Sequence, residues 1–127
     1  MMLKFKAWDK DKKVMSIIDE IDFNSGYILI STGYKSFNEV KLLQYTGFKD
    51  VHGVEIYEGD IVKVNVLEGI GPNARIVFKN GMFGVEDDMH GYGYDKGLYS
   101  LNLIINRHEV EVKGNIFESS HLLEVTE

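Results

Sequence analysis

Apolar and polar positions alternate along most of this chain, and a period of two residues predicts β-strands rather than helices. The first example is residues 3–9, where the apolar side chains at positions 3, 5 and 7 share one expected strand face. The other face carries Lys4, Lys6 and Trp8. The chain therefore begins with a half-buried strand that presents basic and aromatic side chains on its second face.

Two further apolar segments follow, residues 14–23 and residues 27–32, with an Asn-Ser-Gly turn between them. Together with the first strand they predict an N-terminal sheet of three strands. Residues 36–45 fit two structures. Ser36 and Glu39 have the spacing of a helix capping box, whereas the side chains from residue 40 onwards alternate as in a strand. We favour the strand.

Turn chemistry dominates the closely spaced segment that comes next. Asp50 and Gly53 occupy the first and fourth positions of a predicted type I turn, where the carboxylate accepts backbone N–H groups. Residues 58–60, Glu-Gly-Asp, predict a second reversal, with Asp60 placed to accept from the backbone. We interpret the segment as structural rather than catalytic.

The strongest local signal is Asn80-Gly81 between two β-rich segments, because this pair supplies the positive φ angles of a type I′ hairpin. With the alternating valines after residue 60, it predicts a meander over residues 60–87. Residues 87–97 form a glycine and tyrosine loop without periodicity. A short helix at 98–106, a strand at 108–117 and a serine-capped helical turn at the end complete the pattern.

Short strands with turns about every eight to twelve residues predict a mainly β fold. We expect a curled antiparallel sheet or a small SH3-like barrel with one or two short helices. A length of 127 residues suits one domain, residues 1–127, with a sufficient core.

Composition narrows the class of protein. The absence of cysteine excludes disulfides, thiolate metal sites and thiol catalysis. No segment has the apolar length of a signal peptide or a membrane span, so we expect a cytoplasmic protein without a membrane partner.

The net charge of -6 argues against a surface built mainly to bind nucleic acid. Residues 1–13 nevertheless carry five lysines against two aspartates, so they are basic while the rest of the chain is acidic. A basic edge on an acidic body predicts pairing with a neighbouring copy, that is, a homo-oligomer.

Candidates for metal binding and catalysis are sparse. The four histidines show no spacing that would place two of them on one face. Asp87, Asp88 and His90 are the densest group of possible ligands, yet a solvated acidic loop is the simpler interpretation. Glu55, Glu58 and Asp60 adjoin glycines or turns, and no nucleophile elbow or phosphate-binding loop is present. We therefore expect no enzyme activity, no catalytic residues, no metal and no cofactor.

Two groups of residues could instead bind a partner. Lys4, Lys6 and Trp8 resemble a strand that holds single-stranded nucleic acid by stacking and phosphate contacts, although a second small core or a contact between subunits explains them as well. Tyr92 and Tyr94 offer large contact area at low entropic cost, or else fold back onto the expected barrel.

Four segments together resemble the YopX family of bacteriophage and prophage proteins: "KFKAWD" at 4–9, "LQYTGFKDVHGVEIYEGDIVKV" at 43–64, "NGMFGV" at 80–85 and "VKGNIFES" at 112–119. Leu43 and Phe117 depart from the expected Met and Tyr but keep their size and polarity. The resemblance implies a phage-derived protein made in a bacterial cell, with a mainly β core and self-assembly. It implies no catalytic role for any residue.

The sequence thus favours a phage-encoded, non-enzymatic homo-oligomer that binds a host or phage protein. The alternative is a nucleic-acid-binding β module that uses Lys4, Lys6 and Trp8. A metal-dependent hydrolase built on Asp87, Asp88 and His90 is a third, weaker hypothesis.

Overall fold

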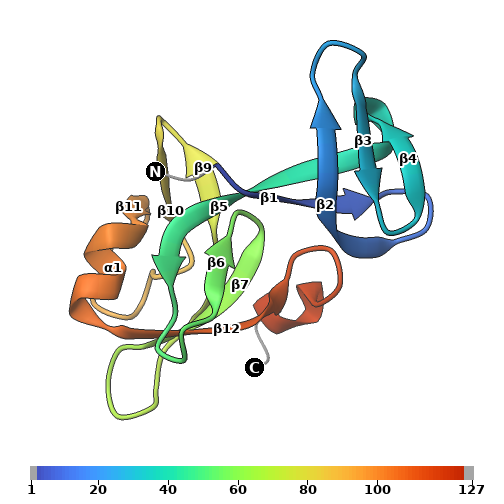
Figure 1. Ribbon diagram of the computed structural model, residues 1–127. Helices are drawn as coiled ribbons and strands as arrows, with labels where there is room; N and C mark the ends of the chain where they lie inside the picture. The colour runs from blue at the N-terminus through green and yellow to red at the C-terminus, as the bar shows by residue number, and fades with distance from the viewer. Residues whose placement is uncertain (1–2, 125–127) are drawn as a thin grey trace. The chain divides into compact units, whose positions relative to one another are not determined.

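The computed structural model describes residues 3–124, which fall into two compact units divided between Tyr45 and Thr46 (Figure 1). The predicted mainly β fold is confirmed, because antiparallel strands account for most of the described structure. Over residues 3–124 these strands form three sheets and do not close into a barrel. Of the two architectures expected from the sequence, a curled antiparallel sheet or a small barrel, the barrel is not observed, and the antiparallel strands are divided among three sheets.

The first unit is a sheet whose strand order is β4-β3-β2-β1-β5. Its elements are β1 (Phe5–Asp9), β2 (Val14–Asp22), β3 (Tyr27–Ile30), β4 (Gly33–Ser36), the short 3-10 helix η1 (Phe37–Glu39) and the first half of β5 (Val40–Lys49). The three predicted N-terminal strands are therefore confirmed, and a fourth, β4, follows them. β5 continues into the second unit, where β6 (Glu55–Tyr57) is its neighbour.

One face of this sheet forms the core of the first unit. Its buried members are Ala7, Ile28, Ile30 and Val40. Partly buried side chains that pack against them are Ile18, Ile21, Phe37 and Leu42. Because successive side chains of a strand point to opposite faces, the residues between these positions project from the other side of the sheet.

Residues 36–45 contain both structures that the sequence allowed. The Glu39 carboxylate accepts hydrogen bonds from the Ser36 backbone N–H and hydroxyl, each at 3.0 Å; Ser36 is the N-cap of η1 and Glu39 its last residue. The strand then begins at Val40. The spacing of Ser36 and Glu39 therefore marks a true capping box, but the helix that follows Ser36 is a single turn that ends where the favoured strand begins.

The second unit contains two three-stranded sheets, with strand orders β12-β7-β8 and β11-β10-β9. The first comprises β7 (Asp60–Asn65), β8 (Asn73–Arg75) and β12 (Glu109–Asn115). The second comprises β9 (Val77–Lys79), β10 (Met82–Glu86) and β11 (Leu98–Ser100). Helix α1 (Leu101–Arg107) and the 3-10 helix η2 (Ser120–Leu123) complete the unit. Its core includes Ile56, Val62, Val64, Ala74, Val85, Met89 and Ile104.

The Asn-Gly hairpin is confirmed: Asn80 has φ 54° and Gly81 has φ 76° between β9 and β10. The single meander expected over residues 60–87 is wrong. β8 pairs with β7, but β9 pairs with β10 in a different sheet. The chain changes sheet at buried Ile76, whose N–H donates to the Asp60 carbonyl at 2.9 Å.

The predicted helix is present but begins at Leu101, because the preceding Leu98–Ser100 segment pairs with β10. The Ser100 hydroxyl caps it by accepting from the Leu103 N–H at 3.1 Å. The terminal helical turn is also present as η2, although the Ser119 side chain makes no capping bond. Within residues 3–124, no helix has the length and apolar character required to cross a bilayer.

Candidate interaction surface

The strand register of the first unit defines a second face on the side of the sheet opposite the core. Directly paired residues of antiparallel strands share a face, and the pairs on this side are Lys6 with Ile17, Trp8 with Met15, Glu20 with Leu29, Leu29 with Tyr34, and Asp22 with Tyr27. We call these residues of β1–β4 the outer face. A bulge in β2 between Ile18 and Glu20 shifts the alternation of the strand by one residue, so Ile17 before it and Glu20 and Asp22 after it lie on the same face.

Large apolar side chains of the outer face are exposed. Ile17 is 76% exposed, Tyr34 69% and Tyr27 52%. Exposed apolar side chains that cluster on one surface of a soluble protein mark sites of interaction. The outer face therefore has the composition of a contact surface.

The β2–β4 end of the outer face is hollowed, with a volume of about 350 Å³. Its lining consists of Glu20, Asp22, Ser25, Tyr27, Ile28, Leu29 and Tyr34. The side chain of Ile28 belongs to the core face, so two aromatic rings and the aliphatic side chain of Leu29 stand beside two carboxylates. We call this feature the tyrosine hollow.

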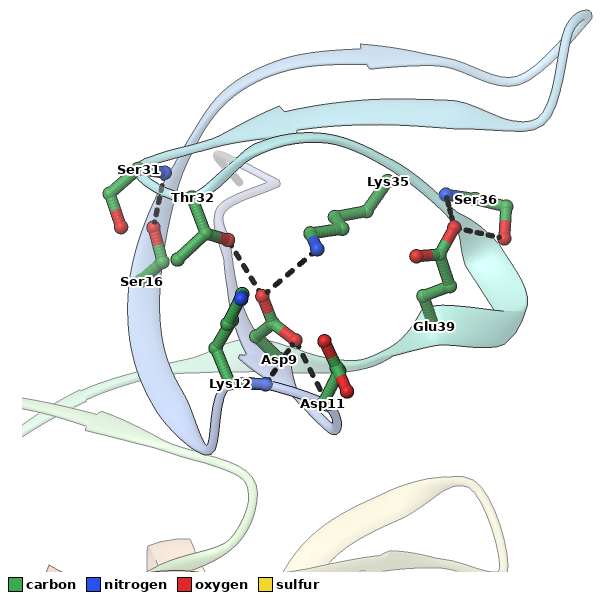
Figure 2. Close-up of polar contacts among 9 residues, drawn as sticks. All are labelled: Asp9, Asp11, Lys12, Ser16, Ser31, Thr32, Lys35, Ser36 and Glu39. Atoms are coloured by element: carbon green, nitrogen blue, oxygen red, sulfur yellow. Dashed lines mark hydrogen bonds and ion pairs between the residues drawn. The ribbon is translucent and has the colours of Figure 1, made fainter.

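A buried carboxylate beneath the outer face fixes the strand turns of this unit (Figure 2). Asp9 is fully buried, and its Oδ1 accepts from the backbone N–H groups of Asp11 and Lys12, each at 3.0 Å. Its Oδ2 accepts from the Thr32 hydroxyl at 2.7 Å and lies 3.5 Å from Lys35 Nζ. The Asp9 carboxylate therefore joins the β1–β2 turn to the β3–β4 hairpin.

These contacts keep Asp9 ionised. The Lys12 N–H and the Thr32 hydroxyl lower its pKa from 3.8 to about 2, outweighing the opposing effect of burial, with smaller help from Asp11 and Lys35. Nearby, the Ser16 hydroxyl accepts from the Ser31 N–H at 3.0 Å. The polar groups of this unit thus hold the sheet in one shape and leave the outer face to make contacts.

The N-terminal candidates lie partly on this surface. Lys6 and Trp8 belong to the outer face by register. Lys4 precedes β1, and its Nζ lies 5.4 Å from the centroid of the Tyr45 ring. The predicted separation of the two faces of β1 is therefore confirmed, while the partner that these residues bind stays a prediction.

The two tyrosines of the loop at 87–97 differ from each other. The Tyr94 hydroxyl is 2.9 Å from His108 Nε2, and its ring meets Tyr99 edge-on at 5.0 Å. Tyr94 therefore packs on the core of the second unit. Tyr92 is 39% exposed and stays a candidate for contact.

The acidic loop is organised by its own hydrogen bonds. The Asp88 carboxylate accepts hydrogen bonds from Arg75 Nε at 3.1 Å and from the Arg75 backbone N–H at 2.9 Å. Asp87 Oδ1 accepts from the Gly97 N–H at 2.7 Å. His90 is nearby on the same loop but exposed. Among the described residues, no group of three or more His, Cys, Asp or Glu side chains is arranged to hold a metal ion.

The central segment is built from turns, as predicted. Asp50 Oδ1 accepts from the N–H groups of His52 and Val54, and its Oδ2 accepts from Val112 N–H at 2.9 Å. Burial alone would raise the pKa of Asp50. The three hydrogen bonds, of which the Val112 bond has the largest effect, outweigh burial and leave the pKa below its ordinary value. Gly53 has φ 82° and closes the turn.

The second reversal in this segment is equally structural. Asp60 Oδ2 accepts from the Tyr57 N–H at 2.8 Å, and the Glu55 carboxylate accepts from the Tyr57 hydroxyl at 3.3 Å. Asp60 thus organises the backbone of the reversal, and Glu55 binds a neighbouring hydroxyl.

Sequence reasoning did not find the tyrosine hollow. The sequence places Tyr27 in the expected strand at 27–32 and Glu20 and Asp22 in the apolar segment at 14–23, and it predicts no element for Tyr34. The available signal was the alternation of residues 27–30, which places Tyr27 and Leu29 opposite Ile28 and Ile30. Only the pairing of β3 with both β2 and β4 brings the lining residues together.

Comparison with known proteins gives one family and two solved structures. A family model described as YopX protein matches residues 4–124. Protein EF1440 from Enterococcus faecalis is 26% identical with a TM-score of 0.68, over 98% of this chain and 99% of that chain. Protein yopX from Bacillus subtilis is 17% identical with a TM-score of 0.64, over 98% of each chain. No curated protein matches this chain.

Proposed function

This chain belongs to the YopX family, and from that premise we propose that it is a non-enzymatic interaction module, encoded by a phage or prophage, that binds a protein partner through its outer face. The partner is a host protein or another phage protein. The place of action is the cytoplasm of the bacterial host.

The exposure of apolar side chains on the outer face carries this proposal. Ile17, Tyr27 and Tyr34 are each more than half exposed on a sheet whose other face is a packed core. Tyrosine is enriched among the residues that dominate binding energy, because it buries much area while losing few rotamers. Protein binding is therefore the chemistry that this surface suits best.

The roles of the acidic residues support a non-enzymatic function. Asp9, Asp50 and Asp60 are buried or nearly so, and each accepts backbone N–H groups. A general acid or base needs a pKa near the working pH, whereas the pKa values of Asp9 and Asp50 are lowered. Folding accounts for these carboxylates without a reaction.

The distribution of charge supports assembly into a homo-oligomer. Residues 1–45 hold seven lysines and six acidic residues, whereas residues 46–127 hold seven basic and fourteen acidic residues. The lysine-rich start of one copy therefore has an acidic surface to pair with on another. Reversing the charge of Lys4 and Lys6 should lower the mass in solution, and the mass of the wild type should fall with added salt.

The outer face is tested by Ile17→Asp, with Leu67→Asp as the matched control. Both wild-type side chains are exposed, at 76% and 67%, so neither change should unfold the chain, and Leu67 lies in the second unit. In affinity purification from a bacterial lysate, we expect the wild type and Leu67→Asp to retain the same bacterial protein. We expect Ile17→Asp not to retain it. Equal retention by all three proteins, or none by any, would contradict the proposed surface.

A further inference from the structure

We propose that the tyrosine hollow is a binding site for an arginine side chain presented by a protein other than a second copy of this chain. This inference rests on the proposed function, because it names what one end of the outer face recognises.

The register of three strands builds the hollow. Leu29 of β3 is paired with Glu20 on one side and with Tyr34 on the other. Tyr27, two residues before Leu29, is paired with Asp22. The two rings and the two carboxylates therefore border Leu29, with an apolar floor and a polar edge on the β2 side.

The charges of the hollow select a cation. Glu20 and Asp22 are the charged residues of its lining, and both are exposed. The nearby Lys35 belongs to the core face, where its Nζ lies 3.5 Å from Asp9 and its side chain is 12% exposed. Lys35 therefore neutralises Asp9 rather than the hollow, and the hollow keeps a negative edge.

One of the two carboxylates is held in place by its own turn. Asp22 Oδ1 accepts from the N–H groups of Asn24 and Ser25, at 2.9 and 3.1 Å. A carboxylate fixed in this way loses little conformational entropy when it accepts a further donor. The edge of the hollow is therefore preorganised.

The aromatic lining favours arginine over lysine. A guanidinium stacks flat on tyrosine rings while its N–H groups bind a carboxylate in pairs, whereas an ammonium is a compact and more strongly hydrated charge. A volume of about 350 Å³ is at the small end of ligand sites and suits one long side chain. The hollow thus fits an arginine whose stem crosses Leu29 and whose head reaches Glu20.

This chain offers little arginine of its own. Of its fourteen basic residues, two are arginines. Arg75 binds Asp88 through Nε at 3.1 Å and through its second terminal nitrogen at 3.3 Å. Arg107 ends α1 and is the one remaining source. Since a second copy could offer only Arg107, we place the arginine on a different protein.

The test compares three synthetic peptides, acetyl-Gly-Leu-X-Leu-Gly-amide, in which X is arginine, lysine or citrulline, the neutral isostere of arginine. Binding to the full-length protein is followed by NMR shifts of the Glu20 and Tyr34 amides. We expect the arginine peptide to bind several-fold tighter than the lysine peptide and about tenfold tighter than the citrulline peptide. Glu20→Gln and Tyr34→Ala should each weaken binding of the arginine peptide by about tenfold. Glu109 is exposed in the second unit, so Glu109→Gln should leave this binding unchanged.

Equal binding of arginine and citrulline, or shifts that do not map to the hollow, would overturn the inference. The proposed function would survive that result if Ile17→Asp still abolished retention of the bacterial partner, so the two failures can be told apart. If Arg107→Ala lowers the mass in solution, and if assembly no longer competes with the arginine peptide for the hollow in that variant, the occupant is a second copy. That result would overturn the choice of a foreign protein.

Discussion

Asp9 shows how much a single side chain determines in this protein. Its two oxygens accept from two backbone N–H groups and one hydroxyl and pair with one ammonium group, all from β1–β4 and their turns. The sequence marks it only as the last residue of a strand before a lysine-rich turn. Since a buried carboxylate without these partners would be strongly unfavourable, the four contacts and the fold of the first unit depend on one another.

Replacing Asp9 with Asn should destabilise the first unit by about 3 kcal/mol. The amide keeps the shape of the carboxylate, but its NH2 group cannot accept from the donors that face it and it leaves Lys35 without its counter-charge. The measurement is urea unfolding followed by the fluorescence of Trp8, the neighbouring residue. Asp11→Asn, at an exposed position of the same turn, is the control and should change the free energy of unfolding by less than about 0.5 kcal/mol.

The lowered pKa of Asp9 predicts a dependence of stability on pH. The unfolded chain takes up this proton near the ordinary value of 3.8, whereas the folded protein takes it up near 2. Stability from Asp9 is therefore complete above about pH 5 and is lost as the pH falls towards 2, for a total of about 2 kcal/mol. Other carboxylates with a lowered pKa act in the same direction. The difference in the free energy of unfolding between wild type and Asp9→Asn therefore isolates the contribution of Asp9. A difference that stays constant from pH 5 to pH 2 would refute the assignment.

At two places in this fold, a turn or a side chain binds the backbone at the edge of a strand. The Asp50 turn lies along β12, where Val112 N–H donates to the Asp50 carboxylate and Val51 N–H donates to the Val110 carbonyl. In the same way, the Glu39 carboxylate accepts from the Ser36 N–H at the end of β4. Backbone groups that would otherwise invite pairing with another chain are thereby satisfied. The dense central segment is thus explained by edge protection as well as by chain reversal.

The hairpin between β9 and β10 gives a prediction at this scale. Gly81 has φ 76°, a conformation that costs an alanine about 1 kcal/mol, and nothing lies within 4 Å of an added Cβ. Gly81→Ala should therefore lower the free energy of unfolding by about 1 kcal/mol through strain alone. Asn80→Gly, at φ 54° in the same turn, should be nearly neutral. Thermal unfolding of both variants checks this, and equal losses would argue against a type I′ turn.

Charge is unevenly shared across the whole molecule. The lysines of residues 1–45 nearly balance their acidic residues, while the remainder carries twice as many acidic as basic residues. A fully acidic chain would have no basic surface with which to attract a neighbour, and a fully basic one would attract nucleic acid. The observed division favours association between proteins.

The same division predicts weak binding to nucleic acid, the alternative function. Lys6 and Trp8 share the outer face, but Glu20 and Asp22 lie on that face as well and repel a phosphate backbone. A fluorescent single-stranded oligonucleotide should show no saturable binding at about 50 mM salt. Tight binding that weakens steeply with salt, and that is lost in Trp8→Ala, would instead establish the nucleic-acid module.

The sequence alone determined the features that depend on neighbours along the chain. Alternation identified the strands, since side chains of a strand change face at every residue. Asn80-Gly81 and Asp50 with Gly53 identified turns, because their backbone conformations and side-chain bonds are local. Even the ambiguity at residues 36–45 was informative, since a capping box and a strand both occur there.

The tertiary structure decided what depends on pairing between distant segments. No local signal shows that the chain changes sheet at Ile76, because β8 and β9 each look like half of one strand until their partners are known. The partners of Asp9 come from residues as far along the chain as Lys35. The tyrosine hollow likewise exists only because β3 pairs with β2 and β4 at once. Strand register is fixed by the burial of one whole face, so the composition of the opposite face, where we place the function, is a property of the folded sheet.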